Sequence, residues 1–133
     1  MKKKVVIFGL LALMFAACHQ ETMEERTLRE CQEITRKRCP EDQGNNSFLD
    51  SMVFDVKSHT IIHYYRLVKE ADNEENAMAK KAELDERMVE AIRQDMSYRS
   101  VKDAGYSFRF IARSDSSGRV LYDKTITKDD YGY

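Results

Sequence analysis

One long amphipathic stretch, residues 72–98, separates two pairs of strand-like segments, and this order constrains the fold more than any other feature of the sequence. Its apolar side chains recur every three or four positions, as they do on one face of an α-helix. They are Ala77, Leu84, Met88, Ala91 or Ile92, and Met96. Asp72 and Glu75 match a capping box at the start of the stretch. The pattern predicts a single long helix.

The residues before this helix predict a pair of strands. Within residues 49–68, Met52 and Phe54 alternate with polar side chains, and residues 60–68 are rich in β-branched and aromatic types. A turn is expected near residues 57–58. Because both faces of the second strand carry apolar side chains, we expect this strand to be central or covered on both faces.

The residues after the helix predict a short helical turn and a second pair of strands. Residues 100–104 are followed by Gly105, which is typical of a helix end. Residues 106–110 alternate aromatic and polar side chains, and residues 114–118 are rich in Asp, Ser and Gly, as turns are. Residues 120–126 would form the returning strand. The chain thus predicts two β-hairpins, one on each side of the long helix.

The two ends of the domain predict less regular structure. Residues 27–37 predict a short helix that ends before Pro40, because proline cannot continue it. Residues 41–47, rich in Asp, Gly and Asn, predict a loop, and residues 128–133 a flexible tail. The expected fold class is therefore α+β: an antiparallel sheet of about four strands, in two hairpins, packed against one long helix, with a short N-terminal helix.

The first residues of the chain do not fit this domain. Lys2, Lys3 and Lys4 precede an apolar run, residues 5–17, which is shorter than the roughly 20 residues that a membrane-spanning helix needs. A charged start, a short apolar run and small residues at its end are the features of a secretory signal peptide. We therefore expect the chain to be exported and this leader to be removed.

The residues Phe15-Ala16-Ala17-Cys18 resemble the lipobox of bacterial lipoproteins, with Phe15 where a leucine is usual. The resemblance implies that the thiol of Cys18 is diacylated, that the chain is cut before it, and that its new amino group is usually acylated as well. It further implies a membrane partner through the lipid anchor, at the outer membrane, with the domain facing the periplasm or the cell surface.

On this interpretation the chain has four parts. Residues 1–17 are the removed signal peptide, 18–26 a lipidated tether, 27–127 the α+β domain and 128–133 the flexible C-terminal tail. A mature chain of this length is expected to form one domain.

Cys31 and Cys39 remain once Cys18 is assigned to the lipid. Because an exported protein can form disulfides, we predict a disulfide between them, with two free thiols as the alternative. The geometry sets a condition. One continuous helix would hold their Cα atoms about 12 Å apart, whereas a disulfide spans at most about 7 Å. Pro40 favours a turn at Cys39 that would bring the two closer.

Charge and motifs argue against several classes of function. The chain has 22 Lys and Arg against 23 Asp and Glu, without the clustered basic face that nucleic-acid binding needs. It has no Gly-rich phosphate loop, HExxH pair or nucleophile elbow. We therefore predict no catalytic residue, metal site, cofactor or nucleic-acid partner, and favour a non-enzyme. His59 and His63 would lie about 13 Å apart on a strand, too far to bind one ion, and His63 is expected to be a sheet residue rather than a general base.

Aromatic and arginine side chains gather on the predicted strands. If one sheet face is left uncovered, they would form a binding patch, because Tyr and Arg anchor many protein interfaces. The alternative is that the helix covers the aromatic ones as ordinary core. The patch would comprise Tyr64, Tyr65, Arg66, Tyr106, Phe108, Arg109 and Tyr122.

The order of these features resembles small uncharacterised envelope lipoproteins of Gram-negative bacteria, of the Bacteroidota type. The likeness rests on the cysteine-containing N-terminal helix, the Tyr64-Tyr65 hairpin, the Ala104-Gly105-Tyr106 turn and the hairpin at residues 115–118. No motif among these carries an activity, so the resemblance implies none.

The sequence leaves several functions open. The leading hypothesis is a lipid-anchored, non-enzymatic binding or accessory protein of the outer membrane with an envelope protein as partner; the pilotin class, which escorts secretion components, is one form of it. An immunity lipoprotein that neutralises a secreted toxin is an alternative. The competing class is a small envelope hydrolase, which would need two converging carboxylates, or His63 with a carboxylate partner, in a cleft. A purely structural envelope component is a third class.

Overall fold

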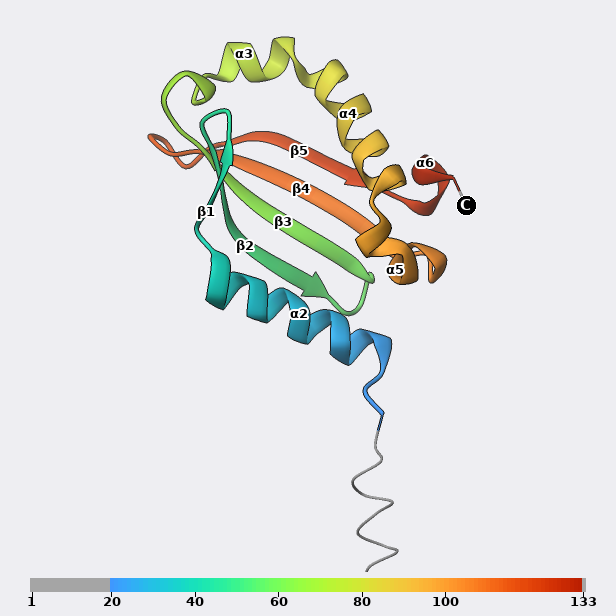
Figure 1. The fold of residues 1–133 in the computed structure, drawn as a ribbon. Coiled ribbons are helices and arrows are strands. Elements are labelled where there is room, and N and C mark those ends of the chain that lie inside the picture. The colour runs from blue at the N-terminus through green and yellow to red at the C-terminus, as the bar shows by residue number, and fades with distance from the viewer. Residues whose placement is uncertain (1–19, 133) are drawn as a thin grey trace, which may run out of the picture.

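The domain is a five-stranded sheet with helices along one face (Figure 1). The computed structural model describes residues 20–132, so the leader and Cys18 lie outside the described residues. The elements, in chain order, are α2 (Met23–Arg38), β1 (Glu41–Gly44), β2 (Ser47–Asp55), β3 (Thr60–Leu67), η1 (Lys69–Ala71), α3 (Glu74–Ala79), α4 (Lys81–Gln94), η2 (Met96–Tyr98), α5 (Arg99–Asp103), β4 (Ser107–Ser114), β5 (Val120–Ile126) and α6 (Lys128–Tyr131). Across residues 20–132, no helix is both long and apolar enough to cross a membrane.

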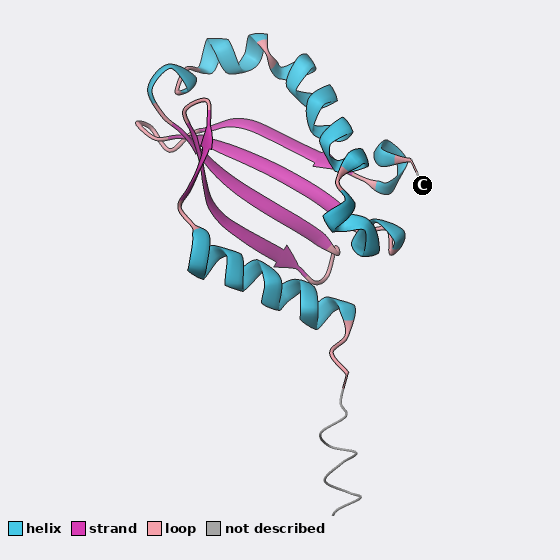
Figure 2. Ribbon diagram, in the orientation of Figure 1, coloured by secondary structure: helices cyan, strands magenta, loops and turns pink. Residues whose placement is uncertain are grey.

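The strands lie side by side in the order β1-β2-β3-β4-β5 (Figure 2). Both predicted hairpins are present, because β2 pairs with β3 and β4 with β5 in antiparallel registers. The central pair, β3 and β4, is parallel. The prediction of an antiparallel sheet of about four strands on one long helix is therefore wrong, although the fold is α+β. The long connection between β3 and β4 makes the difference, because it has room to return the chain to the end of the sheet where β3 began.

The additional strand, β1, occupies the segment that we expected to be a loop. It pairs with β2, with Glu41 opposite Leu49. The turn that follows holds Gly44 and Asn45 at φ of 79° and 54°, which glycine and asparagine adopt more readily than other residues. Because β1 carries no apolar side chain, hydrophobic periodicity could not identify it.

The predicted helix 72–98 is broken into α3, α4 and η2. Asn73 caps α3, whereas the side chain of Asp72 accepts a hydrogen bond from the backbone of the β4–β5 turn. The chain departs from ideal helical geometry at Lys80 (φ −97°, ψ 0°). Asp95 follows α4 in extended geometry and accepts a hydrogen bond from the backbone two residues further on. At Asp95, this local bond between side chain and backbone ends the helix within a stripe that is periodic throughout.

The N-terminal helix, α2, is longer than the predicted helix 27–37 and lies along β2. The side chain of Thr22 caps its start. Near its other end the hydroxyl of Thr35 accepts a hydrogen bond from the backbone N–H of Met52 at 2.9 Å, which ties the helix to the strand.

The hydrophobic core lies between the helices and one face of the sheet. Phe108 of β4 and Ile126 of β5 are both 0% exposed. On the helices, Cys31 of α2 and Ile92 of α4 are buried in the same cluster. On this one face, α2 therefore packs over the β2 side of the sheet and α4 over the β5 side.

The C-terminal residues belong to this core as well. Residues 128–131 form α6, and Tyr131 is 0% exposed. Its hydroxyl lies 3.1 Å from the carbonyl oxygen of Lys102 and 3.0 Å from that of Tyr106. The structure therefore differs from the expected flexible tail, because the buried ring of Tyr131 and the hydrogen bonds that Arg93 donates to the carbonyls of Asp130 and Tyr131 dock the last helical turn.

Candidate functional site

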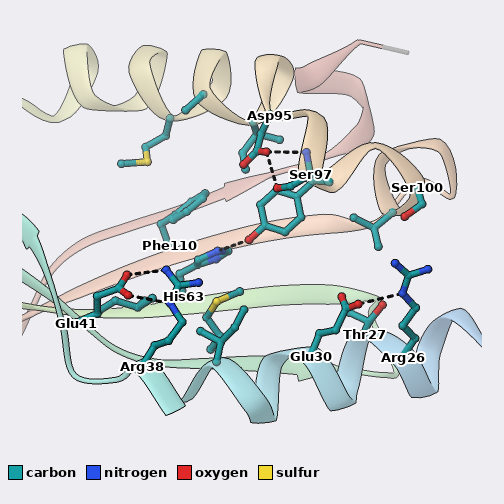
Figure 3. Close-up of a pocket in the computed structure, with 18 of the residues that line it drawn as sticks. Arg26, Thr27, Glu30, Arg38, Glu41, His63, Asp95, Ser97, Ser100 and Phe110 are labelled. Atoms are coloured by element: carbon teal, nitrogen blue, oxygen red, sulfur yellow. Dashed lines mark hydrogen bonds and ion pairs between the residues drawn. The ribbon is translucent and has the colours of Figure 1, made fainter. Parts of the chain in front are cut away.

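A cleft of about 870 Å³ lies over the middle of the sheet, between α2 on one side and α4, η2 and α5 on the other (Figure 3). α2 packs on β2, while α4 lies against β5. Three strand spacings separate those strands, about 14 Å, whereas helices that pack directly on each other are roughly 8–10 Å apart. The helix layer is therefore open above the central strands.

The floor of the cleft is apolar and aromatic. It is formed by side chains on the core face of β2, β3 and β4, namely Leu49, Met52, His63, Tyr65 and Phe110. His63 and Phe110 are register partners on the parallel pair, and their rings stack with 4.6 Å between centroids. The floor therefore spans the parallel pair at the centre of the sheet.

The wall formed by α2 combines apolar side chains such as Ile34 with paired charges. Arg26 lies 3.0 Å from Glu30, and Arg38 lies 2.8 Å from Glu41. The side chains of both arginines are largely exposed. Because exposed ion pairs contribute little to stability, these side chains can rearrange around an occupant at small cost.

The opposite wall is apolar along α4, where Met88 and Ile92 line the cleft, and polar at η2, where Asp95, Ser97 and Tyr98 line it. One carboxylate oxygen of Asp95 accepts hydrogen bonds from the backbone N–H of Ser97 at 2.9 Å and from its hydroxyl at 2.6 Å. Figure 3 shows this pair across the cleft from Arg26 and Arg38.

A buried lysine holds the second wall in place. Lys102 of α5 is 1% exposed, and its Nζ donates to the carbonyl oxygens of Ile92 at 2.7 Å and Arg93 at 3.0 Å. These carbonyls lie in the last turn of α4, where a cation is favoured; that of Ile92 also accepts the backbone N–H of Asp95 at 3.3 Å. Lys102 thereby fixes α5 against α4.

His63 and Tyr98 meet at the floor of the cleft. His63 is 5% exposed, and its Nε2 lies 3.0 Å from the hydroxyl oxygen of Tyr98. Burial lowers the pKa of His63 to about 4, against smaller opposing effects of the carbonyls of Arg109 and Ile61 and of the charge of Asp95. Burial also raises the pKa of Tyr98 well above its usual range. Both side chains are therefore neutral at pH 7.

This environment bears on the hydrolase hypothesis. His63 lies on β3, as a sheet residue, and its hydrogen-bond partner is the phenol of Tyr98 rather than a carboxylate. A base with so low a pKa is a weak proton acceptor at neutral pH. Within residues 20–132, no group of three or more potential ligands could hold a metal ion.

The seven residues of the predicted patch do not form one surface. Four of them belong to the core cluster or pack against it: Tyr65, Tyr106, Phe108 and Tyr122. The register places the others on the opposite sheet face: Tyr64, Arg66 and Arg109. Arg109 is engaged there by Asp123 at 2.6 Å. Of the seven, Tyr65 alone lines the cleft.

The cysteines are free thiols in the structure, and the predicted disulfide is not formed. α2 continues without a break to Arg38, so Cys31 and Cys39 stay close to the helical separation of about 12 Å. Cys31 is 3% exposed, and burial raises the pKa of its thiol to about 11. Cys39 is half-buried just beyond the helix. The lipidation predicted for Cys18 lies outside the described residues.

Most cleft residues were not identified from the sequence. Asp95, Ser97 and Tyr98 fall in the stretch predicted as one helix, and Ile34 falls in the predicted short helix 27–37. The available signal was Asp95 two residues before Ser97, a pattern typical of a side chain that binds the backbone and starts a new turn.

Comparison with protein families finds one match. A family described as a domain of unknown function (DUF8479) matches residues 22–122, from the start of α2 into β5. No curated protein matches the sequence.

The fold is similar to solved structures from Pseudomonas and Vibrio. A presumed secreted protein of Pseudomonas aeruginosa matches with a TM-score of 0.66 and 6% identity over 85% of this chain and 100% of that one. The pilotin EpsS of the Vibrio vulnificus type 2 secretion system matches with a TM-score of 0.55 and 12% identity, over 83% and 96%. The type II secretion pilotin AspS of Vibrio cholerae matches with a TM-score of 0.52 and 16% identity, over 80% and 94%. At these identities the likeness is one of fold.

Proposed function

Since this chain belongs to a family described as a domain of unknown function, DUF8479, we propose its role from its cleft and its fold: it is a lipid-anchored, non-enzymatic accessory protein of the outer membrane whose cleft binds a helical segment of an envelope protein. The lipobox-like residues ending at Cys18 support the anchor. The fold shared with two pilotins supports the accessory role.

The observation that carries the proposal is the opening in the helix layer between α2 and α4. The strands beneath α2 and α4 are about 14 Å apart, less than the roughly 16–20 Å between helix axes that would admit a whole further helix, so what fits the cleft is the apolar face of a helix lying over it. α2 has 16 residues, so its wall extends for about 24 Å and could accompany a helix of about four turns.

An amphipathic helix lying over the cleft would cover the open part of the helix layer. Its apolar face would contact Tyr65 and Phe110 on the floor and bury more of Ile34 and Met88 on the walls, which are partly buried without it. Its polar face would remain in water. Docking of an apolar helix face into a groove is a common mode of peptide recognition.

Site-specific photo-cross-linking in cells tests this function. A photoreactive amino acid at position Ile34 or Met88 should cross-link to one helical segment of one outer-membrane protein, identified by mass spectrometry. The matched control is Val53, which is 43% exposed on the opposite sheet face, and it should give no such product. The same product from position 53, or none from either cleft position, would count against the cleft as the binding site.

The anchor is tested separately. Cys18→Ala should abolish labelling with a fatty-acid analogue and release the protein from the membrane fraction, because the lipid chains hold it there. Cys39→Ala is the control and should keep both properties. Labelling that survives Cys18→Ala would exclude lipidation at this residue.

A further inference from the structure

The charges around the cleft are unequally matched. Its lining includes four acids, Glu21, Glu30, Glu41 and Asp95, and two arginines, Arg26 and Arg38. Three of the acids each lie at 3.0 Å or less from an arginine. Asp95 makes no ion pair within residues 20–132. One end of the cleft therefore carries a negative charge that no ion pair among residues 20–132 balances.

The hydroxyl group beside Asp95 has already used its proton. The hydroxyl of Ser97 donates to Asp95 at 2.6 Å, so its oxygen has only lone pairs left for an occupant. The hydroxyl oxygen of Tyr98 lies 3.0 Å from Nε2 of His63, whereas Nδ1 of that ring has no hydrogen-bond partner among residues 20–132. A ring proton on Nε2, donated to Tyr98, is therefore the assignment that leaves no buried N–H unpaired.

We propose that the helical segment bound in the cleft carries a lysine or arginine that pairs with Asp95 and donates to the hydroxyl oxygen of Ser97. This inference rests on the proposed function and adds the chemistry of the partner: an apolar stripe with a basic residue at one edge. A cationic side chain supplies several N–H donors and no acceptor, which matches a carboxylate beside a hydroxyl group that has already donated its proton.

The same residues would reject other helices. An apolar or acidic side chain placed here would cover Asp95 without a partner, and burying an unpaired charge is costly. A basic side chain would replace the water that Asp95 loses with a charge-assisted hydrogen bond. Asp95 would thus select among amphipathic segments that fit the apolar floor equally well.

Peptide binding to the mature lipoprotein in detergent micelles tests this inference. The probes are fluorescent 18-residue amphipathic peptides with varied apolar stripes, identical within each set except for Lys, Gln or Glu at one edge of the stripe. We expect the best Lys peptide to bind about tenfold more tightly than its Gln counterpart, measured by fluorescence anisotropy at low salt. Asp95→Asn, which keeps the acceptor for Ser97, should abolish the difference. Asp103→Asn, at an exposed acid of α5 outside the cleft lining, should preserve it.

The possible failures separate the two proposals. Equal affinity for the Lys and Gln peptides, with binding lost on Met88→Asp, would overturn the role of Asp95 and leave helix docking intact. A Lys preference that persists in Asp95→Asn would also overturn it. If no peptide of any set binds, helix docking itself fails, and this inference fails with it.

Discussion

Acidification should destabilise this protein through one buried side chain. Burial lowers the pKa of His63 to about 4 in the folded chain, whereas an unfolded histidine titrates near 6.5. The unfolded chain therefore takes up a proton that the folded chain does not. The contribution of neutral His63 to the free energy of unfolding is fully present above pH 6.5 and is lost as the pH falls towards 4. At pH 5 protonation favours the unfolded state by about 30-fold, which corresponds to a loss of about 2 kcal/mol between pH 7.5 and pH 5.

Urea unfolding at pH 7.5 and pH 5, followed by circular dichroism because the chain has no tryptophan, measures this loss. His63→Gln should remove most of it, since glutamine does not titrate. His59→Gln should retain it, because His59 lies in an exposed contact with Glu24. Protonation of Asp72 and of the other aspartates with lowered pKa values also destabilises the folded protein as the pH falls, but only below about pH 5. An equal fall in wild type and His63→Gln would refute the reasoning.

Three further predictions concern residues that hold the fold together. Lys102→Met should lower the free energy of unfolding by about 2 kcal/mol, because the carbonyl of Ile92 loses a charged donor; an unchanged urea midpoint would contradict this. Tyr131→Ala should cost about 3–5 kcal/mol, since it removes a fully buried ring, whereas a truly flexible tail would leave the midpoint where it was. A thiol reagent should modify Cys39 well before Cys31 in the native protein, because Cys31 is buried and its thiol pKa is raised; mass spectrometry that finds a bridged pair, or equal rates, would rule out this arrangement.

The parts of the fold that could be predicted are those that neighbouring residues determine. Alternation within residues 49–68 and 106–126 predicts both hairpins, because each strand and its partner lie close together in sequence. The parallel pairing of Ile61 with Phe108 leaves no mark in either segment, because no turn links those strands and their register depends on the packing of the whole domain.

The candidate site was predictable only on its floor. His63 and Tyr65 lie on a strand whose apolar character is evident in the sequence. The walls come from α2 and from the region around Asp95, and their separation depends on which strands the two helices cover. The apolar periodicity also predicts that the long helix continues through Asp95. In the structure the backbone N–H of Ser97 donates to the Asp95 carboxylate, and the helix ends there.

The parallel pair at the centre of the sheet also determines at which stage of folding the cleft forms. Each hairpin can form from a short local loop, but β3 meets β4 only after residues 68–106 have been brought across, and such long-range closure is slow. The floor of the cleft spans this seam. A newly made chain therefore lacks this cleft until β3 and β4 have paired, and if the cleft binds a helix as proposed, its occupant would distinguish folded copies from those still folding.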